Sequence, residues 1–160
     1  MIRILFTYAN TSELGGADFC LLKLATALSP EIFKVHLALS QKCGLEEIYQ
    51  RENVKLHYVK MPRLQVTKNP FRIIEYLIKG TKSIIHLTRI IKRNHIDIVH
   101  ANDLLDYYGP IAAKLSGIRS LQHVRMILPE GIMKNILTKL VLLLNDRIVA
   151  VSEGTAKSMF

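Results

Sequence analysis

Several features that would place this sequence in a special class of protein are scarce or missing. It has only two cysteines, Cys20 and Cys43, whose spacing fits neither a disulfide framework nor a zinc site. No apolar run reaches the roughly 18 residues of a membrane-spanning helix. The first residues have the pattern of a strand and lack a signal-peptide cleavage site. These absences predict a protein of the reducing cytoplasm.

The composition excludes a disordered chain. Apolar residues make up 49% of the 160 residues, whereas disordered chains combine charge with low hydrophobicity. A domain of this length buries roughly two thirds of the surface that its unfolded chain exposes. We therefore expect residues 1–160 to form a single domain, either alone or as part of a larger protein.

Acidic residues are nearly absent between Lys60 and Arg93. This segment holds nine basic residues and one acid, Glu75, so it carries +8 of the chain's net charge of +9. Apolar residues recur in it at helical spacing: Ile73, Leu77, Ile84, Leu87 and Ile91. A helix with an apolar stripe and a basic opposite face suits three roles: a solvated cover for a sheet, a surface against anionic lipid, or a surface that binds nucleic acid.

Nucleic acid is not expected as a partner. No recognised nucleic-acid-binding motif accompanies the basic residues. The sequence has no Trp to stack on bases, and its aromatic residues do not alternate with the basic ones. A solvated helix is the plainest interpretation of residues 60–93, and contact with an anionic membrane surface is the functional alternative.

Apolar runs that end at turn residues alternate with segments of helical periodicity along the chain. Six runs are predicted to be strands: 2–8, 33–39, 54–59, 96–101, 119–126 and 147–151. The predicted helices are 18–28, 45–51, 71–94, 103–116, 129–144 and one that begins at residue 153. This alternation is typical of an α/β fold, a Rossmann-like doubly wound parallel sheet of about six strands with helices on both faces.

Ligands of such sheets bind beyond the carboxyl ends of the strands. Four loops lie there, at residues 8–18, 100–103, 123–130 and 152–154. In the first of them, Gly15 and Gly16 directly precede a helix, where close backbone approach and free amides favour an anion such as phosphate. The same pair is also common in tight turns that bind nothing, and it is not the GxGxxG fingerprint of dinucleotide binding.

His100 and His123 stand at the ends of the fourth and fifth predicted strands, whereas His36 and His57 lie inside strands and are interpreted as structural. Arg125 follows His123 by two residues, which places both side chains on one side of a strand. A histidine with an arginine suits a ligand that carries hydroxyls and negative charge. No metal site is expected, because no third ligand joins them, and the chain has neither a nucleophile elbow nor a phosphate-binding lysine loop.

Four short motifs follow one another at these predicted strand ends. They are Gly15-Gly16-Ala17-Asp18, His100-Ala101-Asn102-Asp103, His123-Val124-Arg125 and Ala150-Val151-Ser152-Glu153. In this order they resemble the N-terminal domain of retaining GT-B glycosyltransferases of the family-4 type, which build bacterial surface polysaccharides and glycolipids. The resemblance covers nearly the whole chain.

The resemblance implies one Rossmann-like half of a two-domain enzyme. In such enzymes the N-terminal half mainly binds the acceptor, a glycan or glycolipid. The C-terminal half holds most of the nucleotide-sugar donor and carries paired glutamates and diphosphate-neutralising basic residues. That second domain is not contained in residues 1–160, so we expect this chain alone to transfer no sugar. No cofactor or metal is implied, because the nucleotide sugar is a substrate. The expected location is the cytoplasm, with a peripheral position on the inner face of the membrane as the alternative.

The resemblance also implies roles for individual residues. Gly15 and Gly16 match the glycine loop that approaches the donor diphosphate, and Asp18 stands where the family more often has glutamate. His123 matches the histidine beside the reacting sugar and is the predicted catalytic residue. Arg125 matches a basic position present in a subset of members. The residues predicted to bind the acceptor or substrate are His100, Asn102, Asp103 and Arg125.

Two other functions remain open at this point. The chain could be a non-catalytic, membrane-docked scaffold subunit that recruits a separate donor-binding partner, or half of a nucleotide-sugar epimerase of the same fold. An epimerase would place acidic and basic catalytic residues in this half, and the strand ends offer little acid beyond Asp103 and Asp106. Sequence beyond Phe160 would separate the enzyme half from the scaffold.

Overall fold

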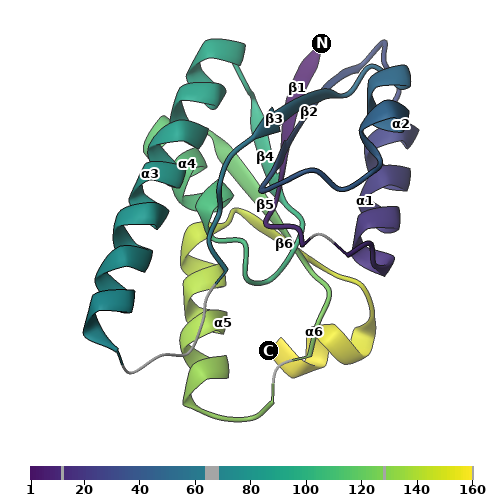
Figure 1. Cartoon of the computed structure of the whole chain (residues 1–160). Coiled ribbons are helices and arrows are strands. Elements are labelled where there is room, and N and C mark those ends of the chain that lie inside the picture. Colours follow the sequence, from purple (N-terminus) through teal and green to yellow (C-terminus); the bar gives the residue numbers. More distant parts are fainter. Residues whose placement is uncertain (12, 64–68, 128, 160) are drawn as a thin grey trace.

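Figure 1 shows the computed structural model of the chain, which describes residues 1–11, 13–63, 69–127 and 129–159. Strands and helices alternate along these residues. The strands are β1 (Ile2–Tyr8), β2 (Phe33–Leu39), β3 (Lys55–Tyr58), β4 (Ile98–Ala101), β5 (Arg119–Val124) and β6 (Arg147–Ala150). The helices are α1 (Gly16–Ala27), α2 (Glu46–Arg51), α3 (Pro70–Asn94), α4 (Tyr108–Ser116), α5 (Ile132–Leu144) and α6 (Glu153–Met159).

The described strands form one sheet in the order β3-β2-β1-β4-β5-β6, and every neighbouring pair is parallel. The chain starts in the middle of the sheet, builds one half outward from β1, and then returns to build the other half from β4. This confirms the predicted Rossmann-like, doubly wound fold. The connections diverge between β1 and β4, and such a switch point is where ligands of open α/β sheets bind.

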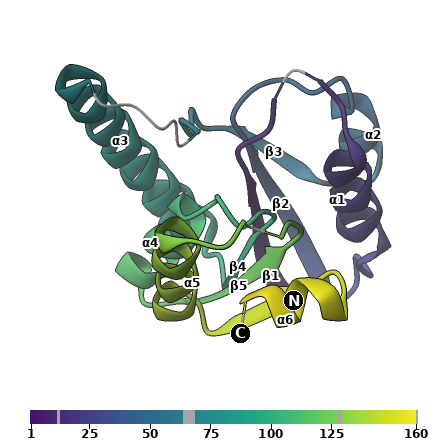
Figure 2. The same ribbon diagram turned by 90° about the horizontal axis from the view of Figure 1, so that it is seen from below.

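Helices α1 and α2 cover one face of the sheet, whereas α3, α4 and α5 lie on the other side (Figure 2). Strand β1 therefore has apolar side chains on both faces. Ile4, Phe6 and Tyr8 belong to the core under α1 and α2, and Leu5 belongs to the core under α3 and α4. Coverage on both faces explains the near-continuous apolar run of β1.

Several predicted boundaries are wrong, chiefly at helix starts. The helix predicted from residue 103 begins at Tyr108, and the one predicted from residue 129 begins at Ile132. Pro110 thus falls in the first turn of α4, where its missing N–H breaks no helical hydrogen bond. Strands β3 to β6 are each one or two residues shorter than predicted at an end, because the terminal residues lie outside the paired part of the sheet.

The apolar stripe of α1 is confirmed except at its first residue. Helical spacing predicts that Phe19, Leu22, Ala25 and Leu28 face the core; the last three do, but the Phe19 ring is 48% exposed, and Asp18 and Leu21 are buried beside them. The Asp18 carboxylate accepts the N–H of Gly15 at 2.9 Å, and its Oδ2 lies 3.5 Å from the Tyr8 hydroxyl. These polar contacts turn Asp18 inward.

Helix α3 is packed along only part of its length. Leu87 and Ile91 are buried under it as predicted, but Ile73 and Leu77 are exposed. The first turns of α3 project beyond the body of the domain (Figure 2). The prediction that the apolar stripe packs against the domain is therefore confirmed for the second half of the helix and wrong for the first half.

Two glycines allow the α3–α4 layer to approach closely. A Cβ on Gly109 would lie 2.2 Å from Oγ1 of Thr7, so only glycine lets the start of α4 rest on β1. A Cβ on Gly80 would lie 3.3 Å from the ring of Tyr108. The Tyr108 hydroxyl also donates to the carbonyl of Pro62 at 2.5 Å. Glycine is unfavourable inside a helix, but at position 80 it makes room for the ring of Tyr108, which joins α3 to α4.

We expect Gly109→Ala to destabilise the protein by about 1–3 kcal/mol, because the added methyl group overlaps a strand side chain in a packed core. Urea unfolding followed by circular dichroism measures the loss. Gly154→Ala is the control, since its Cβ would meet only Oγ of Ser152 at an ordinary 3.8 Å. Equal stability of Gly109→Ala and the wild type would contradict the close contact.

Candidate functional site

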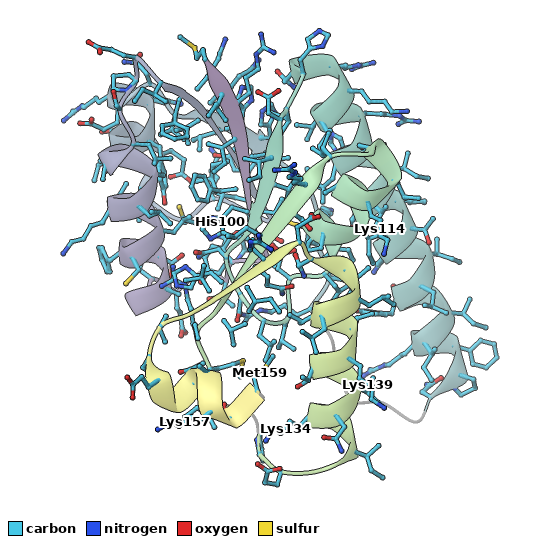
Figure 3. The ribbon with its side chains drawn as sticks, turned by 180° about the vertical axis from the view of Figure 1, so that it is seen from behind. His100, Lys114, Lys134, Lys139, Lys157 and Met159 are labelled. Atoms are coloured by element: carbon cyan, nitrogen blue, oxygen red, sulfur yellow. The ribbon has the colours of Figure 1, made fainter. Side chains whose placement is uncertain are left out.

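The loops selected from the sequence meet at the carboxyl edge of the sheet. The register pairs Thr7 of β1 with Ala101 of β4, Ala101 with Gln122 of β5, and Val124 of β5 with Ala150 of β6. The carboxyl ends of these strands are therefore level, and the residues that follow them share one edge. His100 lies near the centre of the molecule in this region (Figure 3).

His100 and His123 face one another across neighbouring strands. Their ring centroids are 5.7 Å apart, and the His100 ring also packs on Phe6 at 4.8 Å. Arg125 joins them, with Nη2 lying 3.2 Å from Nδ1 of His123. Its Nε and Nη2 also donate to the carbonyl and the side-chain oxygen of Asn102, at 3.1 and 2.9 Å. The structure thus brings together four predicted site residues, which we call the histidine–arginine cluster.

The arginine fixes the tautomer of His123. A guanidinium group can only donate, so Nδ1 of His123 accepts and the ring proton of the neutral imidazole resides on Nε2. Burial, reinforced by the positive charge of Arg125, lowers the pKa of His123. The ring is therefore neutral at physiological pH and offers Nε2–H as a hydrogen-bond donor.

His100 is held neutral even more firmly. Burial, followed by the effects of His123 and Arg125, lowers its pKa to about 3. Its Nε2 is buried and has no partner among the described residues, and the same is true of the side-chain amide nitrogen of Asn102. Buried polar atoms without partners are costly in a finished core. Because these atoms lie at the switch point, they are suited to form hydrogen bonds with a ligand.

Asp103 and Asp106 follow β4 but differ in their surroundings. Asp103 is half-buried, its Oδ1 accepts the N–H of Leu104 at 2.6 Å, and burial raises its pKa. Asp106 is fully buried at the start of α4, where it faces the N–H of Gly109 at 3.4 Å. Burial raises the pKa of Asp106 to about 6. Asp106 therefore supports the helix, and Asp103 is the acid nearer to the site.

Sequence reasoning missed the residue that fixes the loop after β4. Gln122 is buried in β5, and its amide nitrogen donates to the carbonyls of Asp103, Leu104 and Asp106 at 2.8, 3.0 and 3.3 Å. Its side-chain oxygen accepts from Asn145 at 2.6 Å. The sequence of β5 is Arg-Ser-Leu-Gln-His-Val, so one more polar residue in this mostly polar strand gave no distinguishing signal. Gln122 thus positions the loop after β4.

The glycine loop lies across β1 from the cluster. Burial together with the carboxylates of Asp18 and Asp103 raises the pKa of Tyr8 to about 12, so the start of α1 and the loop after β4 act on the same tyrosine. The Gly15 amide already donates to Asp18. The first amides of the helix, those of Gly16 and Ala17, have no intrahelical acceptor and remain the backbone donors for an anion. Phosphate binding by Gly15 and Gly16 stays a prediction.

Residues 14–159 match the sequence profile described as Glycosyltransferase Family 4. The chain belongs to this family. The predicted family is confirmed, and with it the assignment as an N-terminal domain of the GT-B type. No curated protein sequence gives a significant match.

Solved structures share the fold at low sequence identity. HepE from Anabaena, solved with UDP and glucose, matches at a TM-score of 0.70 and 15% identity, over 99% of this chain and 40% of that one. MurG from Acinetobacter baumannii matches at 0.66 and 18%, over 94% and 41%. A putative UDP-N-acetylglucosamine 2-epimerase from Listeria monocytogenes matches at 0.67 and 12%, over 99% and 41%. The chain spans about 40% of the length of these proteins.

Two searches of the described residues bear on other kinds of site. No three His, Cys, Asp or Glu side chains in the described part of the chain gather as a metal site requires. None of the helices described here combines the length and the apolar character needed to cross a bilayer.

We expect Arg125→Met to raise the pKa of His123, because it removes the neighbouring positive charge that disfavours the imidazolium. An NMR titration of the histidine ring protons measures the shift. Arg119→Met is the matched control, because it removes the same charge from the amino end of the same strand. An unchanged or lower His123 pKa in Arg125→Met would disprove the electrostatic coupling.

Proposed function

We propose that this chain is the acceptor-binding half of a retaining glycosyltransferase, which transfers a sugar from a nucleotide-sugar donor to a cell-surface polysaccharide or a lipid-linked acceptor. One observation carries the proposal. In a family-4 fold, His123 lies on the strand beside the switch point as a neutral ring. Its Nδ1 faces Arg125, and its Nε2–H has no acceptor among the described residues. Such a donor suits a sugar hydroxyl.

In the proposed reaction each residue has a distinct task. His123 donates from Nε2 to the transferred sugar and fixes its orientation. Arg125, held by Asn102, places positive charge near the departing diphosphate, and preorganised charge of this kind stabilises a transition state. The free amides at the start of α1 face the same phosphates. His100, Asn102 and Asp103 bind acceptor hydroxyls.

The proposed enzyme needs a second domain. We infer that this domain holds the nucleotide and most of the donor contacts, because the groups available here are one guanidinium and a few backbone amides. HepE was solved with UDP-glucose, which supports a nucleotide-sugar donor for a protein of this fold. We propose that transfer is metal-independent, with these groups and the second domain neutralising the diphosphate.

An epimerase is a weaker candidate, although one similar structure is a putative epimerase. Asp106 is fully buried against α4 and cannot meet a ligand, which leaves Asp103 as the acid at these strand ends. A non-catalytic scaffold would have no use for a precisely held, neutral His123.

We expect His123→Ala in the complete enzyme to lower kcat by about 100- to 1,000-fold, as when a donor to the transition state is removed. His123→Gln should retain more activity, because its amide can still donate a hydrogen bond. Turnover of the nucleotide sugar measures both, and thermal unfolding shows whether the variants remain folded. Full activity of a folded His123→Ala enzyme would exclude the proposed role and favour the scaffold.

We further propose that the start of α3 binds the anionic surface of the membrane as a peripheral contact. Phe71 is 80% exposed and Leu77 60% exposed, and Ile74 and Ile78 beside them are more than half exposed. Arg72 and Lys79 lie on the same stretch of the helix. Apolar side chains that enter the lipid surface and basic ones that meet its phosphates bind together, and each basic residue adds about 1 kcal/mol.

We expect the protein to sediment with vesicles of anionic lipid and to be released by salt, because added salt screens the attraction. Phe71→Ser combined with Leu77→Ser should weaken this binding. Leu115→Ser is the control, since Leu115 is 66% exposed but lies on α4, away from the projecting turns. Equal binding to neutral vesicles would defeat the electrostatic part of the proposal.

A further inference from the structure

A second recess lies at the same sheet edge as the histidine–arginine cluster, on the other side of β1. It has a volume of about 730 Å³ and is formed by the segments after β1, β2 and β3 and by the middle of α3. Lys60, Lys79, Lys82 and His86 line it. We call it the α3 pocket. The proposed roles of the cluster do not involve it.

Side chains tie the walls of the α3 pocket together. The side-chain oxygen of Asn10 accepts the N–H groups of Ser40 and Gln41 at 2.9 and 3.2 Å. The Ser40 hydroxyl lies 3.3 Å from both the N–H and the carbonyl of Met61. The Ser83 hydroxyl of α3 donates to the carbonyl of Lys60. Four separate segments are thus joined, so the recess is built into the fold and does not depend on one loop.

The α3 pocket holds positive charge that the described residues do not neutralise. Lys79 pairs with Glu75 at 2.5 Å, whereas Lys60 and Lys82 form no ion pair in the described part of the chain. No aspartate or glutamate is among the lining residues. Lysine ammonium groups gathered in a recess without carboxylates are suited to an anion with several oxygen acceptors, such as a phosphate.

One wall of the pocket is apolar and leads toward the projecting part of α3. Val59, Met61 and Pro62 form this wall, with the ring of Tyr58 at the edge. Lys79 and Lys82 lie on the turns of α3 that follow Leu77 and Ile78, both exposed. A molecule with a phosphate and a hydrocarbon chain would meet lysines at one end and apolar residues at the other. An inorganic anion would use only the first of these.

We propose that the α3 pocket binds the phosphate or diphosphate group of a lipid-linked acceptor. This assignment rests on the proposed glycosyl transfer and specifies its acceptor as phosphorylated. With the start of α3 on the membrane, the lysines lie where the phosphates of a membrane lipid end, and the acceptor's sugar is directed toward β1 and the cluster. The pocket thereby holds the phosphate end of the acceptor, and the cluster binds its hydroxyls and the transferred sugar.

Calorimetric titration with farnesyl diphosphate and with inorganic pyrophosphate tests the assignment. We expect farnesyl diphosphate to bind more tightly, because it also covers the apolar wall. Lys82→Ala and Lys60→Ala should each weaken its binding by about tenfold. Lys92→Ala is the matched control, because it removes the same charge from the same helix but lies outside the pocket. It should bind like the wild type.

Two results would overturn the proposal. Failure of both diphosphates to bind, or an equal loss in Lys92→Ala, would show that the basic side chains form no specific site. Equal affinity for the two probes would overturn the lipid-linked assignment.

In the complete enzyme, Lys82→Ala should raise KM for the acceptor about tenfold and leave KM for the donor unchanged. Diphosphate binding is measured without any donor. The proposed role of the pocket and the proposed transferase activity are therefore tested separately. Binding of farnesyl diphosphate without sugar transfer would refute the activity and leave the pocket, and the reverse result would refute the pocket alone.

Discussion

The parallel pairing of β1 with β4 is the constraint on which the rest of the structure depends. Because β1 is also paired with β2, it lies inside the sheet and must be covered on both faces. The two connections that leave this centre run in opposite directions, so no crossover closes the edge above β1 and β4. The groups that we assign to sugar transfer border this gap: the start of α1, the loop after β4 and the histidines of β4 and β5.

Buried polar groups maintain the geometry around that gap. Gln122 satisfies three carbonyls of the loop after β4, and Asp106 receives the first amides of α4. Each arrangement removes polar atoms from water, which is unfavourable unless every partner is present. As a result, the backbone of the loop after β4 is held in place by buried side chains. Some partners are missing: Oδ2 of Asp106, Nε2 of His100 and the side-chain nitrogen of Asn102 are buried and have no hydrogen-bond partner among the described residues.

Much of the fold was predictable because strands buried on both faces leave a strong signal. The runs of β1 and β2 have the predicted bounds, and the sheet order follows from the alternation of strands and helices. The burial of Asp18 at the start of α1 was not predictable from the apolar pattern, since it depends on the contacts of this carboxylate with Gly15 and Tyr8. The start of α4 was obscured because Leu104 and Leu105 continue a helical pattern through a turn.

The candidate site was predictable to a similar degree. Strand-end placement selected His100, His123 and Arg125 correctly as neighbours. The tautomer of His123 and the support from Gln122 depend on contacts between strands, and these arise only when the register is known. The same holds for His36 and His57, which lie in different strands yet stack and share a hydrogen bond of 3.0 Å.

The partial packing of helix α3 follows from a difference in length between the helix and the strands that it covers. At 1.5 Å per residue, its 25 residues extend about 37 Å. The four-residue strands β3 and β4 extend only about 13 Å at 3.3 Å per residue. The sheet can therefore cover only one half of the helix, which is the half that carries Leu87, Ile90 and Ile91. A free half in water alone would need polar residues, yet Phe71, Ile74 and Leu77 occupy it. The apolar pattern thus continues beyond the part of the helix that the sheet covers, and this exposed part is the one that we propose to bind the membrane.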